Sequence, residues 1–259
     1  MLNNNTMENT LYHYTNSHAI INILNTGLLR ATHARYFDDA SDCRYAIEIA
    51  RELESKLKSD MIFNSLEKCI ITNPRYVVSL SERQNDPYLW EKYGQNGHGA
   101  CIVIDSKKLE SSNPYGIWDD IFCCYDQEYQ ITQLKEIIPS LTDSETSLAS
   151  MNQFWKYSMS FKNTQYARES ETRKIFTSQP LQYLDQSHIT TEITDDVQII
   201  NRNLNQCIDH HYFDEKMRPF MNLHVKESIK EVVFGPHFKA TFPYFDFLKR
   251  NYSICQIGP

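Results

Sequence analysis

The sequence predicts an α+β fold in a single domain, with mixed central β-sheets flanked by helices. At 259 residues the chain is long enough to bury a full hydrophobic core. Short alternating or continuously apolar segments are interleaved with segments whose apolar residues recur every three or four positions. No repeat, low-complexity tract or clear linker divides the chain. We therefore expect one domain over residues 11–259, after a disordered lead-in at residues 1–10.

The N-terminal part predicts two strands, each followed by a helix. Residues 11–15 read as a short strand, and Asn16 or the serine after it can cap the helix that follows. Gly27 is the type of residue that ends such a helix. Residues 28–32 read as extended again. Apolar residues at helical spacing then predict a helix over residues 41–57.

The central part predicts strands for the middle of the sheet. Residues 76–81 alternate like a strand, and Asp86 with the proline after it supplies the cap and first turn of a short helix. Residues 100–105 form a continuous apolar run, which is typical of a central strand. Residues 121–125 look like its neighbour.

The C-terminal half has weaker patterns, and residues 178–200 are polar with little periodicity. The elements expected there are helices at 127–138, 145–160, 198–218 and 241–250, and strands at 171–177, 220–226 and 230–234.

Composition and missing motifs argue against several classes of protein. Twenty-six basic against 33 acidic residues give a net charge of −7, which disfavours a sequence-independent nucleic-acid coat. No stretch approaches the roughly 20 apolar residues of a membrane span. Seven cysteines without a C-x-x-C pair favour a reduced, cytoplasmic protein. Neither G-x-x-x-x-G-K-[ST] nor G-x-G-x-x-G is present, so the sequence has no glycine-rich loop for phosphate. H-E-x-x-H is also missing, and we expect no metal site.

The most informative motif is Glu169-Ser-Glu171, which lies between two arginines and leads into a predicted strand. Side chains two positions apart on an extended chain share a face, so the two carboxylates should lie side by side. Arg168 and Arg173 could supply the cations that offset their repulsion. Several sites that cleave or transfer sugars are built on such a pair. A solvated, charged edge strand fits the same residues equally well.

Seven segments stand in order over residues 11 to 236 and carry a resemblance. They are Leu11–Thr15, Gly27–Phe37, Ser79–Arg83, Leu89–Gly94, Gly99–Ile104, Glu169–Arg173 and Glu231–Pro236. Together they resemble a bacterial family known only as domain of unknown function 2971. The resemblance implies membership of that family but no particular activity.

A second resemblance implies a function. A strand with His-x-Thr, a helix ending in Gly-Leu and an extended stretch with an arginine are similar to the opening of ADP-ribosyltransferase folds, in particular of bacterial toxins that modify DNA. In that superfamily a polar residue of the first strand holds NAD, and a late glutamate grips the nicotinamide ribose. The resemblance implies that His13 and Thr15 bind NAD. It also implies that Glu171 is catalytic, with Glu169 as general base or positioning group.

Further contacts to NAD are expected from arginine and aromatic residues. Because no glycine cradle is present, an arginine should bind the pyrophosphate, with Arg35 favoured over Arg83. The other expected contacts, from rings that can stack on nicotinamide or adenine and from one serine, are Tyr14, Tyr36, Trp90, Tyr93 and Ser81.

Each of these residues also has a structural interpretation. His13 can bond a backbone carbonyl, and both arginines have acidic residues close by in sequence. Trp90 and Tyr93 share one helical face and can belong to the core, and Ser81 can simply pack.

The sequence therefore favours an NAD-consuming enzyme that transfers ADP-ribose to a macromolecule or hydrolyses NAD, as a bacterial toxin or phage-defence effector. The expected partners are NAD, a protein or nucleic-acid acceptor, and an antitoxin or sensor, with no membrane. The alternative is a non-catalytic module that senses a nucleotide or binds a partner in the same cleft. A nuclease that uses the carboxylates for Mg²⁺ is a third possibility. The first hypothesis requires His13 and Glu171 to border one cleft.

Overall fold

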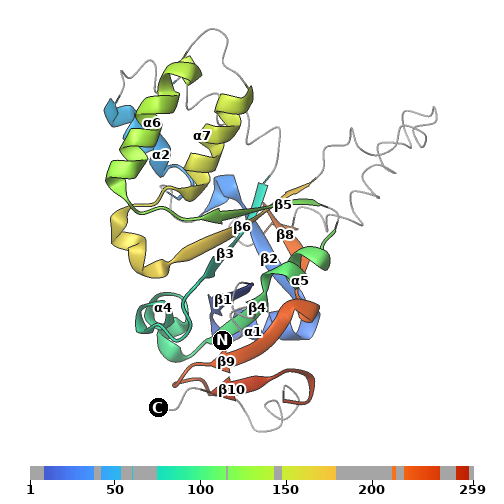
Figure 1. The fold of residues 1–259 in the computed structure, drawn as a ribbon. Helices are drawn as coiled ribbons and strands as arrows, with labels where there is room; N and C mark the ends of the chain where they lie inside the picture. The colour runs from blue at the N-terminus through green and yellow to red at the C-terminus, as the bar shows by residue number, and fades with distance from the viewer. Residues whose placement is uncertain are drawn as a thin grey trace, which may run out of the picture.

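The computed structural model describes residues 9–37, 42–53, 60, 75–114, 116–142, 148–178, 212–213, 219–239 and 249–256. Within these ranges ten strands form one sheet, accompanied by helices, so the predicted α+β class is confirmed (Figure 1). The strand order is β10-β9-β4-β1-β3-β2-β8-β7, and β5 and β6 lie off this path. All strand pairs are antiparallel except β9 with β10.

The strands are β1 (Thr10–Thr15), β2 (Leu28–His33), β3 (Arg75–Ser81), β4 (Ala100–Asp105), β5 (Gly116–Phe122), β6 (Glu171–Ser178), β7 (Tyr212–Phe213), β8 (Pro219–His224), β9 (Ile229–Phe234) and β10 (Ile254–Gln256). The α-helices are α1 (Ser17–Thr26), α2 (Tyr45–Leu53), α4 (Pro87–Lys92), α5 (Ser106–Ser111), α6 (Gln127–Thr142) and α7 (Leu148–Ser160). The 3-10 helices are η1 (Ala34–Tyr36), η2 (Gln95–Gly97), η3 (Thr164–Glu169) and η6 (Lys226–Ser228).

Helices α1 and α4 begin and end as their sequences predict. The Asn16 side chain accepts a hydrogen bond from the backbone N–H of Ala19, and Gly27 closes α1 in the left-handed conformation at φ 70°. At α4 the Asp86 side chain accepts from the backbone N–H of Tyr88. Local capping chemistry is therefore sufficient to place both helices.

Three predicted elements are corrected. Residues 121–125 were expected beside 100–105, but β5 ends at Phe122 and pairs with β6, whereas β4 lies between β1 and β9. Helix α2 begins at Tyr45 because Cys43, with φ 60°, has a non-helical backbone. Residues 212–213, expected in a helix, form β7.

Other expectations fall wholly or mainly outside the described residues. These are the lead-in at residues 1–10, the polar segment 178–200, most of the helix at 198–218 and most of the helix at 241–250.

Strand β3 is the point at which the sheet divides. One edge of β3 pairs with β6 along its whole length, up to Ser81 opposite Glu171. The other edge pairs with β2 at Tyr76 and Val77, and with β1 at the single pair of Ser81 and Tyr12. Strands β1 and β2 thus diverge from one shared edge. Tyr12, Ser81 and Glu171 consequently form a row across three neighbouring strands.

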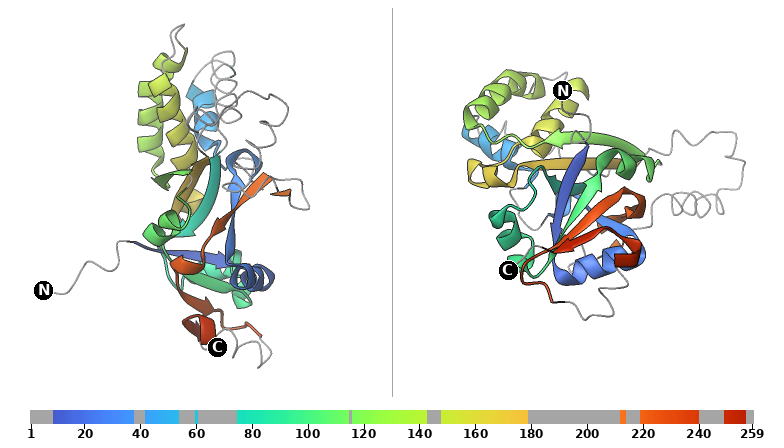
Figure 2. Two further views of the ribbon diagram at one scale, coloured as in Figure 1. Left: turned by 90° about the vertical axis from the view of Figure 1, so that its right-hand side faces the viewer. Right: turned by 60° about the horizontal axis from the view of Figure 1, so that its bottom comes forward.

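Alternation along β3 and β6 sends side chains into two cores. Val78 and Phe176 pack on the face that α1 covers, whereas Val77 and Ile175 pack with α2, α6 and α7. These three helices gather at one end of the molecule, and β9 and β10 lie at the other (Figures 1 and 2). Ser81 and Glu171 lie on the same faces as Val77 and Ile175. They are therefore at the edge of the layer formed by α2, α6 and α7, which we call the helical layer.

In the part of the chain that the structure describes, no helix combines the length and the apolar content needed to cross a membrane.

Candidate functional site

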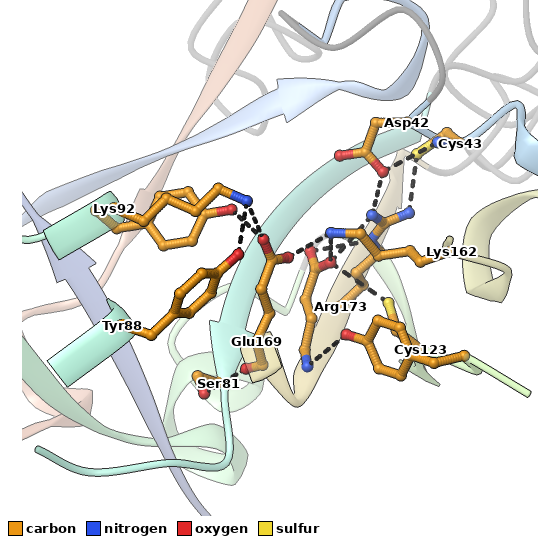
Figure 3. A network of polar contacts seen from close by, with 12 residues as sticks. Asp42, Cys43, Ser81, Tyr88, Lys92, Cys123, Lys162, Glu169 and Arg173 are labelled. Carbon is orange, nitrogen blue, oxygen red and sulfur yellow. Dashed lines mark hydrogen bonds and ion pairs between the residues drawn. The ribbon is translucent and has the colours of Figure 1, made fainter. Parts of the chain in front are cut away.

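Glu169 and Glu171 come from two different elements. Glu169 is the last residue of η3, Ser170 turns the chain with φ 43°, and Glu171 begins β6. The prediction that one extended strand aligns them is therefore wrong. Both carboxylates nevertheless converge, because each lies close to the Nζ atom of Lys162, at 2.6 Å for Glu169 and 2.8 Å for Glu171 (Figure 3).

The two glutamates belong to a row of six charged side chains that alternate in sign, which we call the charge chain. Neighbouring members form ion pairs, and the three positive and three negative charges sum to zero. The members, in spatial order, are Lys92, Glu169, Lys162, Glu171, Arg173 and Asp42.

The central members of the charge chain are buried but remain ionised. Burial alone would raise the pKa of Glu171, but Arg173 and Lys162 together outweigh it and hold that pKa well below its ordinary value. For Lys162 burial would lower the pKa, and the Glu171 charge with its acidic neighbours outweighs burial and raises it. At neutral pH the glutamates are therefore anions and the lysine is a cation.

The oxygen atoms of Glu171 are already occupied. Oε1 accepts a hydrogen bond from Arg173 Nε at 3.0 Å. Oε2 accepts from Arg173 Nη2 at 3.1 Å, from Lys162 Nζ at 2.8 Å and from Cys123 Sγ at 3.4 Å. Glu171 can bind a ligand only after one of these donors moves away.

Glu169 connects the buried part of the charge chain with the surface. Its Oε1 atom accepts from Lys92 Nζ at 2.5 Å and from the Tyr93 hydroxyl at 2.7 Å. The Lys92 side chain is 34% exposed, and its ammonium lies 4.4 Å from the centre of the Tyr166 ring. A lysine among tyrosine rings thus forms the accessible end of the charge chain.

Two cysteines flank the pair of Arg173 and Glu171. Arg173 Nη1 lies 3.2 Å from Cys43 Sγ, and burial raises the pKa of the Cys43 thiol to about 12. Burial also raises the pKa of Cys123. Both thiols are therefore protonated at neutral pH and are poor nucleophiles. No group of three or more potential ligands among the described His, Cys, Asp and Glu residues is placed to hold a metal ion.

His13 is not in contact with the charge chain among the described residues. Its Nδ1 atom lies 3.2 Å from the carbonyl oxygen of Ser79, and burial lowers the pKa of the ring, which favours the neutral form. Alternation along β1 turns His13 away from the face of Tyr12, the face that continues to Glu171. The two residues are thus close in the sheet but face different ways, so the expectation that both border one cleft is wrong.

Ser81 and Tyr93 do contact the glutamates. The Ser81 hydroxyl donates to the backbone carbonyl of Glu169 at 2.7 Å and accepts from the backbone N–H of Arg83 at 3.0 Å. Tyr93 reaches the Glu169 carboxylate directly. Of the predicted site, the structure brings Glu169, Glu171, Ser81 and Tyr93 together.

Tyr14, Thr15 and Trp90 lie in the protein interior. The rings of Tyr14 and Trp90 meet edge to face with centroids 5.0 Å apart, in a small core that includes Val103. The Tyr14 hydroxyl donates to the backbone carbonyl of Arg83 at 3.0 Å. Thr15, at the end of β1, is also buried.

The arginines flanking the motif separate into two roles. Arg173 binds Glu171 as predicted, but Arg168 lies 3.7 Å from Asp86 and over the Tyr88 ring, so the prediction that it offsets the carboxylates is wrong. Arg83 donates to the Ser170 hydroxyl and also pairs with Asp86.

The remaining predicted contacts lie in η1. Arg35 belongs to this 3-10 helix, but its side chain is outside the described part of the chain. Tyr36 is exposed, and its ring lies edge-on to the ring of His33.

Sequence reasoning missed Lys162 and Lys92. Lys162 follows α7 in a stretch without periodicity, seven residues before Glu169. A signal was present, because Asn163 caps η3 by accepting from the backbone N–H of Gln165. An N-cap residue so soon after the end of α7 predicts a sharp change in chain direction. This change brings Glu169 back beside Lys162.

Comparison with known proteins adds one finding. Among curated proteins and among solved structures there is no match. One segment of the chain, residues 89–174, supplies five of the six charge-chain residues, and Asp42 lies outside it. Residues 89–174 match the family model described as Protein of unknown function (DUF2971).

Proposed function

We propose that the protein is an NAD-consuming enzyme of ADP-ribosyltransferase-like fold, in which Glu171 contacts the nicotinamide ribose. The row of Tyr12, Ser81 and Glu171 carries this proposal, because it sets Tyr12 of the first strand on the same face as a glutamate that begins a strand. Tyr12 takes the place expected for His13, whose side chain faces the other way. Opposite residues on antiparallel neighbours lie about 5 Å apart, so Tyr12 and Glu171 are separated by about 10 Å. That distance is on the scale of one nucleoside.

The charge state of Glu171 supports the chemistry. Cleavage of the nicotinamide–ribose bond passes through a state with positive charge on the sugar. An ionised carboxylate beside the ribose stabilises that charge, and Arg173 keeps Glu171 ionised. Lys162 would have to withdraw from Oε2 to free a position for the ribose hydroxyl. Glu169 would then orient the acceptor or take its proton.

The accessible end of the charge chain supplies cations for the pyrophosphate. Lys92 is partly exposed, and Arg83 lies nearby through its bond to Ser170. Within this proposal the protein is cytoplasmic and acts as a bacterial toxin or phage-defence effector. Its partners are an ADP-ribose acceptor, protein or nucleic acid, and an antitoxin or sensor.

The test measures free nicotinamide released from NAD by the wild-type protein and by Glu171→Gln. We expect the substitution to lower the rate by about 100-fold, the usual effect of losing one group that stabilises transition-state charge. Glu128→Gln, a change to an exposed residue of α6, is the matched control. Equal release by the wild type and by Glu171→Gln, or no release with any acceptor tried, would remove the catalytic assignment.

A non-catalytic binding module is the second candidate, because every carboxylate oxygen of Glu169 and Glu171 already accepts a hydrogen bond. This function predicts that NAD stabilises the protein without turnover. A ligand at about 100 times its dissociation constant adds about 2.7 kcal/mol to the free energy of unfolding. Thermal stabilisation without nicotinamide release would favour this candidate over the enzyme.

A further inference from the structure

Two exposed arginines approach the same carboxylate, that of Asp86, and we call them the arginine pair. Arg83 comes from the turn between β3 and α4, and Arg168 comes from η3. Their side chains are 47% and 62% exposed. Because both are open to solvent, a ligand can reach both guanidinium groups without any rearrangement of the core.

The carboxylate of Asp86 does not satisfy the arginine pair. Arg83 Nη1 lies 3.4 Å from Oδ2, and Arg168 Nη2 lies 3.7 Å from Oδ1. The first distance is long for a hydrogen bond and the second is outside hydrogen-bond range. Oδ1 also accepts from the backbone N–H of Tyr88 at 2.8 Å, as the N-cap of α4. One anion that is already used in a helix cap therefore faces two cations.

Several donors of the arginine pair are unused. A guanidinium group can donate several hydrogen bonds at once. That of Arg168 donates none among the described residues, and its contacts are the Asp86 carboxylate and the Tyr88 ring. Arg83 donates from Nε to the Ser170 hydroxyl at 3.0 Å and from Nη1 to Asp86, which leaves Nη2 without a partner in the described part of the chain. The charge chain is the opposite case, because there the carboxylate oxygens of both glutamates are occupied.

Neighbouring groups orient both guanidinium groups. That of Arg168 lies 4.8 Å from the centre of the Tyr88 ring, which is the distance of a cation–π contact. The bond to the Ser170 hydroxyl orients Arg83. An anion that binds here meets donors that are already in place, so less conformational entropy is lost on binding.

Tyr88 joins the arginine pair to the accessible end of the charge chain. Its hydroxyl accepts a hydrogen bond from Lys92 Nζ at 3.2 Å, and its ring contacts Arg168 (Figure 3). Lys92 is therefore a third accessible cation, and its carboxylate partner Glu169 is shared with the buried part of the charge chain. This local excess of positive charge contrasts with the net charge of −7 of the whole chain.

The unused donors indicate phosphate as the ligand. Guanidinium groups match phosphate oxygens in both charge and geometry, and each can donate two parallel hydrogen bonds to them. A phosphate group offers more acceptor oxygens than a carboxylate. It can therefore use the donors of Arg83 and Arg168 that Asp86 leaves unpaired.

We propose that Arg83 and Arg168 form a binding site for a phosphate group. Two sources share this chemistry, the pyrophosphate of a dinucleotide and the backbone of a nucleic acid. The proposal adds Arg168 to the cations that the proposed function assigns to the pyrophosphate. It depends on the unused donors alone and does not require that the protein consume NAD.

The experiment measures binding of pyrophosphate, ADP-ribose and a short single-stranded oligothymidylate by isothermal titration calorimetry. We expect pyrophosphate to bind, with an affinity that falls as the salt concentration rises. Tighter binding of ADP-ribose than of the oligonucleotide identifies a dinucleotide as the source of the phosphate, and the reverse order identifies a nucleic-acid backbone. If none of the three binds at millimolar concentration, the proposal is overturned. Nicotinamide release is measured separately, so phosphate binding without turnover counts against the enzyme alone.

Two variants should change the affinity for pyrophosphate in opposite directions. Arg168→Ala removes one guanidinium group and should weaken binding about tenfold. Asp86→Asn keeps the cap of α4, because asparagine caps helices as well as aspartate does, and removes the competing charge. It should tighten binding about threefold.

Arg30→Ala is the matched control, because it removes an exposed arginine of β2 that lies outside the arginine pair. It should bind pyrophosphate as the wild type does. The proposal is overturned if Arg168→Ala binds as tightly as the wild type, or if Arg30→Ala loses as much affinity as Arg168→Ala. Weaker binding by Asp86→Asn would also overturn it, since the carboxylate would then not compete with the phosphate.

Discussion

Glu171 of the charge chain and Trp90 of α4 are buried to the same degree but differ in how their polar groups are satisfied. Glu171 and Trp90 are each 7% exposed. Every oxygen of Glu171 accepts a hydrogen bond, whereas Trp90 Nε1 donates none among the described residues. Burial alone therefore does not identify a ligand site. An account of donors and acceptors separates a closed network from a buried side chain with an unpaired donor.

The largest effect is expected from breaking the charge chain at its centre. Lys162→Met leaves two buried carboxylates with one cation fewer, which should lower the free energy of unfolding by about 3–5 kcal/mol. Chemical denaturation measures this value. Lys156→Met, an exposed position on the neighbouring helix α7, should change it by less than about 0.5 kcal/mol. Equal, small effects of both substitutions would show that the charge chain contributes little to stability.

A smaller effect is expected at the corner where the turn after β9 packs against η2. Gly235→Ala places a methyl group against the Gly97 carbonyl oxygen, and the backbone shift should cost about 2 kcal/mol. Gly27→Ala is the comparison, because its added Cβ meets only the Lys226 side chain, at 3.3 Å from Cβ and 3.9 Å from Cδ, and its main cost is the left-handed conformation, about 1 kcal/mol. Both values come from urea unfolding curves. If Gly27→Ala proves the more harmful change, close approach is not what requires glycine at position 235.

The smallest effect is expected from Arg168, the exposed one of the two arginines beside the glutamates. Arg168 is 62% exposed and pairs with Asp86, so Arg168→Ala should change the free energy of unfolding by less than about 0.5 kcal/mol. Arg173 is completely buried, and Arg173→Ala should be far more destabilising. Unfolding curves of the two variants, recorded side by side, check this ranking. Similar losses from both would place Arg168 inside the charge chain.

Local signals in the sequence were sufficient for much of the fold. The caps of α1 and α4 and the apolar run of β4 place these elements correctly. The pairing of β5 could not be read from sequence, because its apolar residues fit any neighbouring strand equally well. In the structure β5 pairs with β6, and Ile121 packs in the helical layer.

The candidate site was predictable only in part. The motif identified Glu169, Glu171 and Arg173, because opposite charges close in sequence are visible in a single segment. Lys92 and Lys162 could not be assigned in the same way, since their contacts depend on the turn at Ser170 and on how α4 docks beside η3. The unpaired N–H of Trp90 is likewise a property of the folded surroundings.

Helix α4 is so short that Trp90 and Lys92 lie on one helical turn. It has six residues, with Trp90 packed against Tyr14 in the core and Lys92 bonded to Glu169. The backbone bond from Tyr93 N–H to the Leu89 carbonyl closes its last turn. A shift of Trp90 would therefore also shift Lys92. A spectroscopic label on Glu91 would register events on either side of the helix.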